Sequence, residues 1–260
     1  MSNKDLTDHI SEDGLTADST HLCDHHNDLS AESTLIGDPH SQAEAFAPQT
    51  LDFDCAVQAQ ANLISLFEGH PFSESQAVFE AAEHGLLTEN GTSMGDVGGL
   101  LELHGIGVHR VENGSIQDLV GEISAGRGVI VGVNSSELWD PGFTTWLEDK
   151  FGFKGADHAI TVSGVDMSDP NHPMVIVNDT GLSDGGGDMY PLDQFVDAWG
   201  NSGRFYVATD NPLPGHQPDD GSLYDLLNKD GVLDANPQLA YEAGRSVSGF
   251  TQNDWDHLLS

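Results

Sequence analysis

Residues 47–64 read APQTLDFDCAVQAQANLI, and this stretch changes from loop-like to helical character at Cys55. From Cys55 to about Glu68 the apolar residues recur at close to helical spacing, which predicts a helix. In the first turn of a helix, unpaired backbone N–H groups and the helix dipole favour a thiolate over a thiol. Because the thiolate is the nucleophilic form of cysteine, Cys55 is a candidate nucleophile.

Gln49 lies six residues before Cys55, on the incoming loop. Its side-chain amide could reach back beside the sulfur and, with the Cys55 backbone N–H, provide two donors for an oxyanion. A lone cysteine near a helix start is more often a small buried residue than a nucleophile. The hypothesis therefore depends on a base elsewhere in the chain.

Two predicted strands offer this base and a group to orient it. His158 opens the apolar run HAITVSGV at residues 158–165, and Asp179 follows the run MVIVN at residues 174–178. If these strands form an adjacent antiparallel pair, the start of one lies beside the end of the other, and the two side chains meet. Asn178 is a competing orienter, but side chains alternate across a strand, so only one of the two can face His158. We expect Asp179 to face it.

The order of the predicted elements is helices first and an antiparallel sheet afterwards. This order is typical of an α+β fold and argues against a parallel doubly wound sheet. Besides the helix at Cys55, helices are predicted at residues 73–85, 93–104, 115–125 and 192–199. Strands are predicted at residues 129–133, 158–165, 174–178 and 204–208. The glycine-rich residues 184–188 are predicted to form a flexible loop beside the site.

The site residues resemble those of the papain-like cysteine peptidases, most closely the bacteriocin-processing (C39) type in its free-standing form, without a fused transporter. The resemblance covers about residues 47–209 and rests on Gln49, Asp54-Cys55-Ala-Val, His158-Ala-Ile-Thr-Val-Ser-Gly and Asn178-Asp179. Two positions depart from the family pattern. Thr180 stands where the family usually has proline, and Ala56 stands where it commonly has glycine.

The resemblance implies a papain-like fold, in which an N-terminal helical part carries Cys55 and the sheet carries His158 and Asp179. It also implies hydrolysis of a peptide or protein substrate by this triad, with Gln49 as oxyanion donor and without a cofactor. The same residues suit a thiol amidase, a deamidase or an acyl transferase, which is the first alternative. The second alternative is a non-catalytic module that binds peptides in the same cleft.

The charge and composition of the chain limit its partners. Its 260 residues include 43 acidic and eight basic side chains, and the formal net charge is −35. So negative a chain is not expected to bind nucleic acid or anionic membranes. No apolar run is long enough for a membrane span and no secretory signal is visible, so we expect a soluble protein, cytoplasmic by default. The acidity suits either a saline habitat or ordinary solvation.

Three segments are expected along the chain. Residues 1–46 are predicted to be an acidic, disordered tail, for which a propeptide role is an alternative. Residues 47–209 are predicted to form the peptidase domain, and residues 210–260 a linker and an acidic C-terminal tail. His21, Cys23, His25 and His26 have metal-binding side chains, but their spacing fits no standard zinc site. We therefore expect no metal, and the sequence indicates no oligomeric state.

Overall fold

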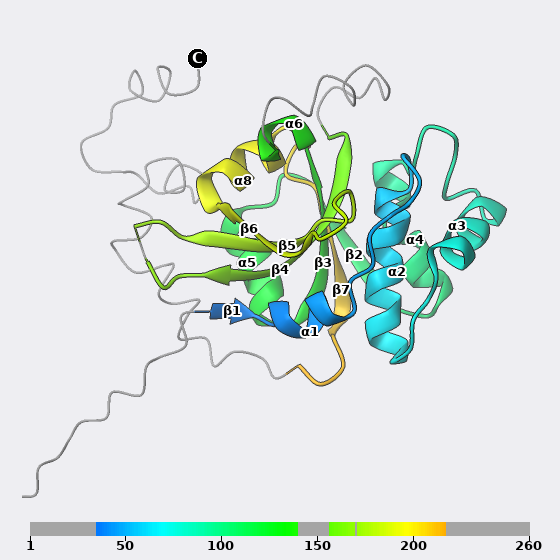
Figure 1. Cartoon of the computed structure of the whole chain (residues 1–260), viewed down its shortest axis with the longest axis horizontal. Helices are drawn as coiled ribbons and strands as arrows, with labels where there is room; N and C mark the ends of the chain where they lie inside the picture. Colours follow the sequence, from blue (N-terminus) through cyan, green and yellow to red (C-terminus); the bar gives the residue numbers. More distant parts are fainter. Residues whose placement is uncertain (1–34, 140–155, 170, 217–260) are drawn as a thin grey trace, which may run out of the picture. The chain divides into compact units, whose positions relative to one another are not determined.

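The computed structural model describes residues 35–139, 156–169 and 171–216 (Figure 1). The sheet has seven antiparallel strands in the order β2-β7-β3-β4-β5-β6, and β1 pairs with β4. The strands are β1 (Leu35–Gly37), β2 (Val108–Val111), β3 (Arg127–Val133), β4 (His158–Asp166), β5 (Met174–Asn178), β6 (Gly186–Pro191) and β7 (Tyr206–Pro212). The α+β class predicted from the sequence is confirmed.

Helices cover both faces of this sheet (Figure 1). They are α1 (Pro39–Glu44), α2 (Cys55–Glu68), α3 (Glu74–Glu83), α4 (Gly99–Leu103), α5 (Ile116–Ser124), α6 (Ser135–Leu138) and α8 (Leu192–Gly200). The helix predicted from residue 73 begins with a capping box, in which the Ser73 side chain accepts from the Gln76 N–H and the Gln76 side chain accepts from the Ser73 N–H. The nucleophile helix precedes every strand of the sheet except β1, which the sequence did not predict.

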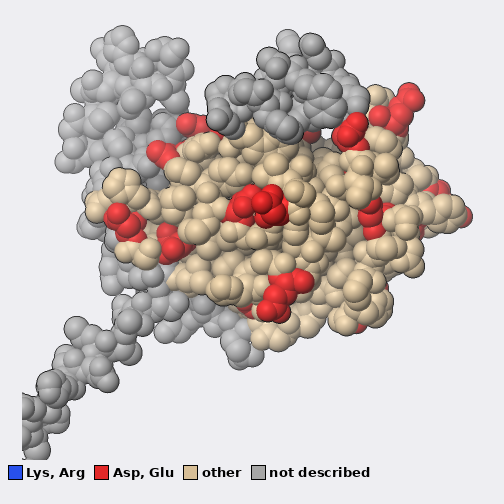
Figure 2. Space-filling model, viewed as in Figure 1, with Lys and Arg blue, Asp and Glu red and all other residues tan. Residues whose placement is uncertain are grey.

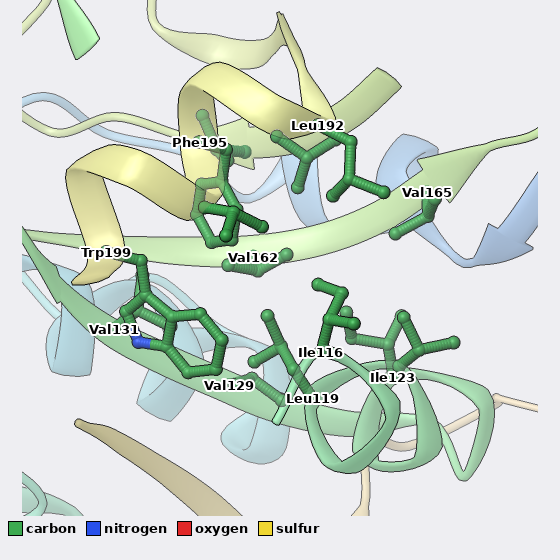
Figure 3. Packing of buried hydrophobic residues seen from close by; sticks show 14 of the residues in the cluster. Ile116, Leu119, Ile123, Val129, Val131, Val162, Val165, Leu192, Phe195 and Trp199 are labelled. Atoms are coloured by element: carbon green, nitrogen blue, oxygen red, sulfur yellow. The ribbon is translucent and has the colours of Figure 1, made fainter. Parts of the chain in front are cut away.

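Two apolar clusters lie on opposite faces of the sheet, as the alternation along β3 requires. Val129 and Val131 pack in a cluster with α5 and α8, whereas Ile130 packs in a cluster with α2, α3 and α4. Figure 3 shows the first cluster, in which Trp199 and Leu119 approach the valines of the sheet from two different helices. The helix that carries Cys55 therefore packs against the opposite face of the sheet from α5 and α8.

The predicted N-terminal tail includes residues that belong to the folded domain. Residues 1–46 were expected to be disordered, but β1 and α1 lie within them and Ile36 is fully buried. A single buried isoleucine in a polar stretch produces no period, so no sequence pattern indicates this strand. Residues 1–34, which contain His21, Cys23, His25 and His26, lie outside the described residues, and the expectations for them stay predictions.

The C-terminal boundary needs a similar correction. The linker was predicted to begin at residue 210, but β7 continues to Pro212 and Leu213 is buried. Asp210-Asn-Pro has a turn-like composition, but Arg127 pairs with Pro212 across the ladder and draws these residues into the sheet. Residues 217–260 lie outside the described part of the chain.

Some local predictions were also wrong in detail. The helix predicted over residues 93–104 is broken into a 3₁₀ turn (Met94–Asp96) and α4, because Gly98 has φ +92°. A Cβ there would lie 2.9 Å from the Val207 side chain, so close packing also requires glycine. The predicted flexible loop over residues 184–188 in fact contains the start of β6, an edge strand that the sequence analysis missed together with β2.

Acidic side chains are spread over the described surface. The face in Figure 2 shows carboxylates in several separate groups and no lysine or arginine among the described residues. Arg110 and Arg127, two of the described cations, form ion pairs with Glu102 and Glu122. Within the described residues, no helix is long and apolar enough to cross a membrane.

Candidate active site

Cys55 is the first residue of α2 and is partly exposed. The preceding residue, Asp54, occupies the N-cap position, but its side chain makes no capping hydrogen bond. The first-turn N–H groups therefore keep their capacity to favour negative charge near the sulfur. The remainder of the helix buries small apolar residues such as Val57 and Ala61, which fixes the direction in which Cys55 points.

His158 and Asp179 meet through the register of β4 and β5. Thr161 pairs with Asn178, so the start of β4 lies beside the residues that follow β5. The His158 Nε2 atom is 2.6 Å from Asp179 Oδ1, and both side chains are buried. The expected antiparallel pairing is therefore present, and it is Asp179 that contacts the imidazole.

Asn178 faces a different partner. Its side-chain Oδ1 accepts a hydrogen bond from the Gly187 N–H in β6 at 3.0 Å. Side chains at adjacent positions point to opposite sides of a strand, which explains why Asn178 and Asp179 separate. The choice of Asp179 over Asn178 as the neighbour of His158 agrees with the geometry, whereas its catalytic role remains a proposal.

Two further groups hold the Asp179 carboxylate, and the sequence analysis identified neither. The Trp139 indole N–H donates to Asp179 Oδ2 at 2.8 Å, and the Gly181 N–H donates to Oδ1 at 2.9 Å. The Trp139 ring also lies 5.1 Å from the His158 ring, centroid to centroid. A Cβ at Gly181 would lie 3.1 Å from the His158 ring, so glycine leaves the room that the imidazole occupies. Trp139 lies too far away in sequence for any local pattern to connect it to this site.

The electrostatics of the pair favour an imidazolium beside a carboxylate. Burial lowers the pKa of His158, but the charge and hydrogen bond of Asp179, together with Cys55, outweigh it and hold that pKa well above its usual value. For Asp179, burial raises the pKa, but His158, Trp139 and Gly181 outweigh it, so the carboxyl pKa is lowered. The pair is therefore stable as an ion pair at neutral pH.

The Cys55 side chain lies close enough to His158 to help raise the pKa of the imidazole, and both residues line one cavity. Because Asp179 occupies His158 Nε2, the other ring nitrogen, Nδ1, is available to the sulfur. The structure thus brings together three of the four residues singled out from the sequence, with Cys55 beside His158 and His158 bonded to Asp179.

Gln49 lies beside these residues, on the loop that enters α2. Its Nε2 donates to the Leu51 carbonyl at 2.7 Å, and its Oε1 accepts from the Thr180 hydroxyl at 3.1 Å. The same hydroxyl lies 3.5 Å from the Cys55 carbonyl oxygen, so Thr180 connects the two residues. A primary amide has two N–H bonds, and the described contacts use one of them. Thr180, a departure from the family pattern, therefore orients Gln49.

A cavity of about 330 Å³ opens beside Cys55 and His158. Its wall is mostly apolar and includes Phe53, Met94, Val97, Ile130, Ala159 and Phe205. The described residues contain no group of three or more His, Cys, Asp or Glu side chains that could hold a metal ion. The arrangement is thus suited to chemistry by a thiolate and an imidazolium next to a pocket for an apolar group.

Comparisons with known proteins find sequence relatives in mycobacteria and solved structures of similar fold. No protein-family model matches it. Over 206 residues it is 28% identical to uncharacterised proteins of Mycobacterium bovis and Mycobacterium tuberculosis, and the alignments cover 69% of this chain and 86% of each relative.

Two solved structures resemble it at low sequence identity. A crystal structure described as a C39-like peptidase from Bacillus anthracis is 16% identical, with a TM-score of 0.48 over 69% of this chain and 98% of that chain. The peptidase domain of Streptococcus ComA, a bifunctional ABC transporter of a quorum-sensing pathway, is 15% identical, with a TM-score of 0.41 over 64% and 97%. Likeness at this level does not transfer an activity to this chain.

Proposed function

We propose that this protein is a papain-like, C39-like cysteine peptidase that hydrolyses peptide bonds with Cys55 as its nucleophile. The observation that carries the proposal is the arrangement of Cys55 beside His158, with His158 bonded to Asp179, at the start of a helix and the edge of a cavity. Each member has the partner that its role needs: a base for the nucleophile and a carboxylate for the base. No cofactor takes part in the proposed reaction.

In the proposed reaction, the Cys55 thiol gives its proton to His158, and the thiolate attacks the carbonyl carbon of the scissile bond. The resulting tetrahedral intermediate collapses as the imidazolium protonates the leaving amine, and the amine departs. Water, deprotonated by His158, then hydrolyses the thioester and regenerates the thiol. Asp179 stabilises the imidazolium and keeps Nδ1 directed at the sulfur in both halves of the cycle.

The oxyanion of the intermediate needs donors that are already in place before the attack. The Cys55 N–H, at the start of α2, supplies one, and the second Nε2 hydrogen of Gln49 supplies the other. Thr180 supports this arrangement because it holds the Gln49 carbonyl oxygen and thereby turns the amide nitrogen to the other side. The substrate carbonyl is thus polarised by two donors of different origin, one from the main chain and one from a side chain.

The cavity beside Cys55 and His158 supports a preference for an apolar substrate side chain near the scissile bond. Met94, Val97 and Ile130 contribute to its wall. Burial of an apolar side chain contributes roughly 1.5–3 kcal/mol relative to leaving it exposed, which is enough for a clear preference. The strongly acidic surface disfavours substrates that are themselves highly acidic.

Labelling with an irreversible thiol-peptidase probe tests the proposal. We expect the wild-type protein to be labelled at neutral pH and Cys55→Ala to be unlabelled. The chain has two cysteines, so Cys23→Ala is the matched control and should keep the labelling. With a peptide substrate, Cys55→Ser should lower turnover by on the order of 10³-fold or more, because the hydroxyl is a far weaker nucleophile. Full hydrolytic activity of Cys55→Ser would contradict the mechanism.

The same experiment separates the alternatives. An amidase, deamidase or acyl transferase would label at Cys55 but would turn over amide side chains or acyl acceptors in preference to peptide bonds. A peptide-binding module would retain its peptide affinity in Cys55→Ala, and the wild-type cysteine would not react with the probe.

A further inference from the structure

Glu74, the first residue of α3, holds the loop that carries Gln49. Its carboxylate accepts hydrogen bonds from the Thr50 N–H, from the Thr50 hydroxyl at 2.6 Å and from the Leu51 N–H at 3.3 Å. These residues directly follow Gln49, so the oxyanion donor is fastened to a neighbouring helix. A carboxylate is well placed there because the N-terminus of a helix favours negative charge.

Asp54 reaches the same carboxylate from the other end of this loop. Its side chain is fully buried, and neither oxygen receives a hydrogen bond from a donor within the described part of the chain. Its side-chain partner is the Glu74 carboxyl group. Two carboxyl groups in hydrogen-bond contact cannot both carry a charge without strong repulsion, so one of them must hold a proton.

The surroundings decide which of the two holds the proton. Both residues lie at a helix N-terminus, but Glu74 accepts three hydrogen bonds, whereas the Asp54 oxygens accept none from a donor in the described residues. Burial, then the hydrogen bond and charge of Glu74, raise the pKa of Asp54 to about 7, and nearby Asp52 adds to the effect. For Glu74, burial raises the pKa but the bonds from Thr50, Asp54 and Leu51 outweigh it, so its pKa is lowered. Glu74 thus keeps the charge.

We propose that Asp54 and Glu74 are positioning residues, in which protonated Asp54 donates to ionised Glu74 and the pair holds both ends of the Gln49 loop. One carboxylate then fastens the loop between the oxyanion donor and the nucleophile, at Thr50 and Leu51 on one side and at Asp54 on the other. When Asp54 loses its proton, the two carboxylates repel each other and the loop loosens. The effect on rate depends on the peptidase function proposed above, whereas the shared proton does not.

Thermal unfolding of the full chain tests the shared proton without any substrate. The folded-state pKa of Asp54 lies above its unfolded value of 3.8, so the folded protein binds the extra proton, and wild-type stability falls as the pH rises toward about 7. Asp54→Asn still donates to Glu74 but does not titrate. We therefore expect the melting temperature of Asp54→Asn relative to wild type to increase by on the order of 5 °C from pH 5 to pH 8.

Glu83→Gln, an exposed carboxylate-to-amide change on the same helix, is the matched control. Its melting temperature relative to wild type should not vary with pH over this range. A difference between Asp54→Asn and wild type that stays constant from pH 5 to pH 8 would overturn the shared proton.

The kinetics of Glu74→Ala test the positioning role. We expect kcat for a peptide substrate at pH 6 to fall by roughly tenfold or more, because the oxyanion donor is misplaced. The rate of Cys55 alkylation by iodoacetamide should change little, because this displacement forms no oxyanion. Glu83→Ala should leave both rates unchanged. An equal loss in alkylation and hydrolysis would overturn the positioning role.

A third measurement is the alkaline fall of kcat in the wild type, which Asp54→Asn should shift to higher pH. An unshifted alkaline limb would also contradict the positioning role. If the wild type hydrolyses no peptide, the peptidase proposal fails, and the unfolding experiment still decides the state of Asp54.

Discussion

The helix that carries Cys55 and the sheet that carries His158 and Asp179 are held in position by different means. In the sheet, the β4–β5 ladder brings the two residues together through main-chain pairing. At the helix, one main-chain bond from the Gln49 N–H to the Thr180 carbonyl holds the incoming loop, and most of its other anchors are side chains. Gln58 and Asn62 both donate to the Ala47 carbonyl, at 3.0 and 3.1 Å.

This difference predicts how substitutions in each half of the site act. Main-chain pairing brings His158 and Asp179 together, and the Trp139 and Gly181 N–H groups hold the Asp179 carboxylate, so we expect substitution of Asp179 itself to act chiefly on charge. The loop that carries Gln49 depends on polar side chains such as Glu74 and Thr180, so substitutions there act on position. In the proposed reaction, the sheet would supply the charges and the side chains around α2 would position the oxyanion donor.

The largest effect should come from removing the carboxylate of the sheet half. Asp179→Ala should lower kcat/KM by roughly 10³-fold, because a buried imidazolium loses its counter-ion. Asn178→Ala, its neighbour and control, should cost about 1–3 kcal/mol of stability through its bond to Gly187 but far less activity. Activity assays and denaturant unfolding of both variants measure this contrast. A reversed order of the two activities would assign the orienting role to Asn178.

The pH profile sharpens the same prediction. Asp179 raises the pKa of His158, so Asp179→Asn lets the imidazolium lose its proton at lower pH. In an Asp54→Asn background, where Asp54 does not titrate, the alkaline limb of kcat/KM should therefore move to lower pH when Asp179 is also changed to asparagine. Kinetics across this range check the sign, and an unmoved limb would mean that another group controls it.

The next effect concerns stability and the N-terminal boundary of the fold. Ile36 is fully buried in the cluster with α5, so Ile36→Ala should lower the free energy of unfolding by about 2–4 kcal/mol. Leu35, its partly exposed neighbour, is the control, and Leu35→Ala should cost less. Denaturant titration measures both. Equal, negligible losses would place β1 outside the stable core and restore the predicted tail up to residue 46.

A smaller effect should follow when Thr180 loses the hydroxyl group that contacts Gln49 in the loop before α2. Thr180→Val keeps the shape of the side chain but removes the donor to Gln49, so we expect kcat to fall by about three- to tenfold. Thr180→Ser keeps the hydroxyl and should retain most of the activity. KM should change little in either variant. If Val and Ser behave alike in steady-state assays, the hydroxyl does not orient Gln49.

The smallest effect should be on substrate preference. Met94 lies in the cavity wall and is 41% exposed, so Met94→Lys should raise KM for peptides with an apolar side chain by about threefold with little change in kcat. Leu103, similarly exposed at 43% but not in the cavity wall, is the control. Leu103→Lys should leave KM unchanged. Equal changes in both variants would point to surface charge rather than to the cavity.

Much of the fold could be predicted because its signals are local. The capping box at Ser73, the helical period after Cys55 and the apolar run after His158 each depend on residues close together in sequence. The edge strands were missed because β2 is only partly buried and β6 is rich in glycine, so neither has the apolar alternation of a half-buried strand. The broken helix near Gly98 was missed because its cause is a close approach to β7, which is far away in sequence.

The sequence by itself determined the residue types and their order: Gln49 before Cys55, a histidine that opens one strand and an aspartate that ends the next. It also determined the alternation that lets only one of Asn178 and Asp179 face the histidine. Tertiary structure alone decided the groups that support them. Trp139 donates a hydrogen bond to Asp179, and Thr180 donates one to Gln49. Glu74 contacts Thr50, Leu51 and Asp54. These contacts join residues 20 to 131 positions apart, and no sequence period encodes such a distance, because only the packed chain brings those groups within hydrogen-bonding range.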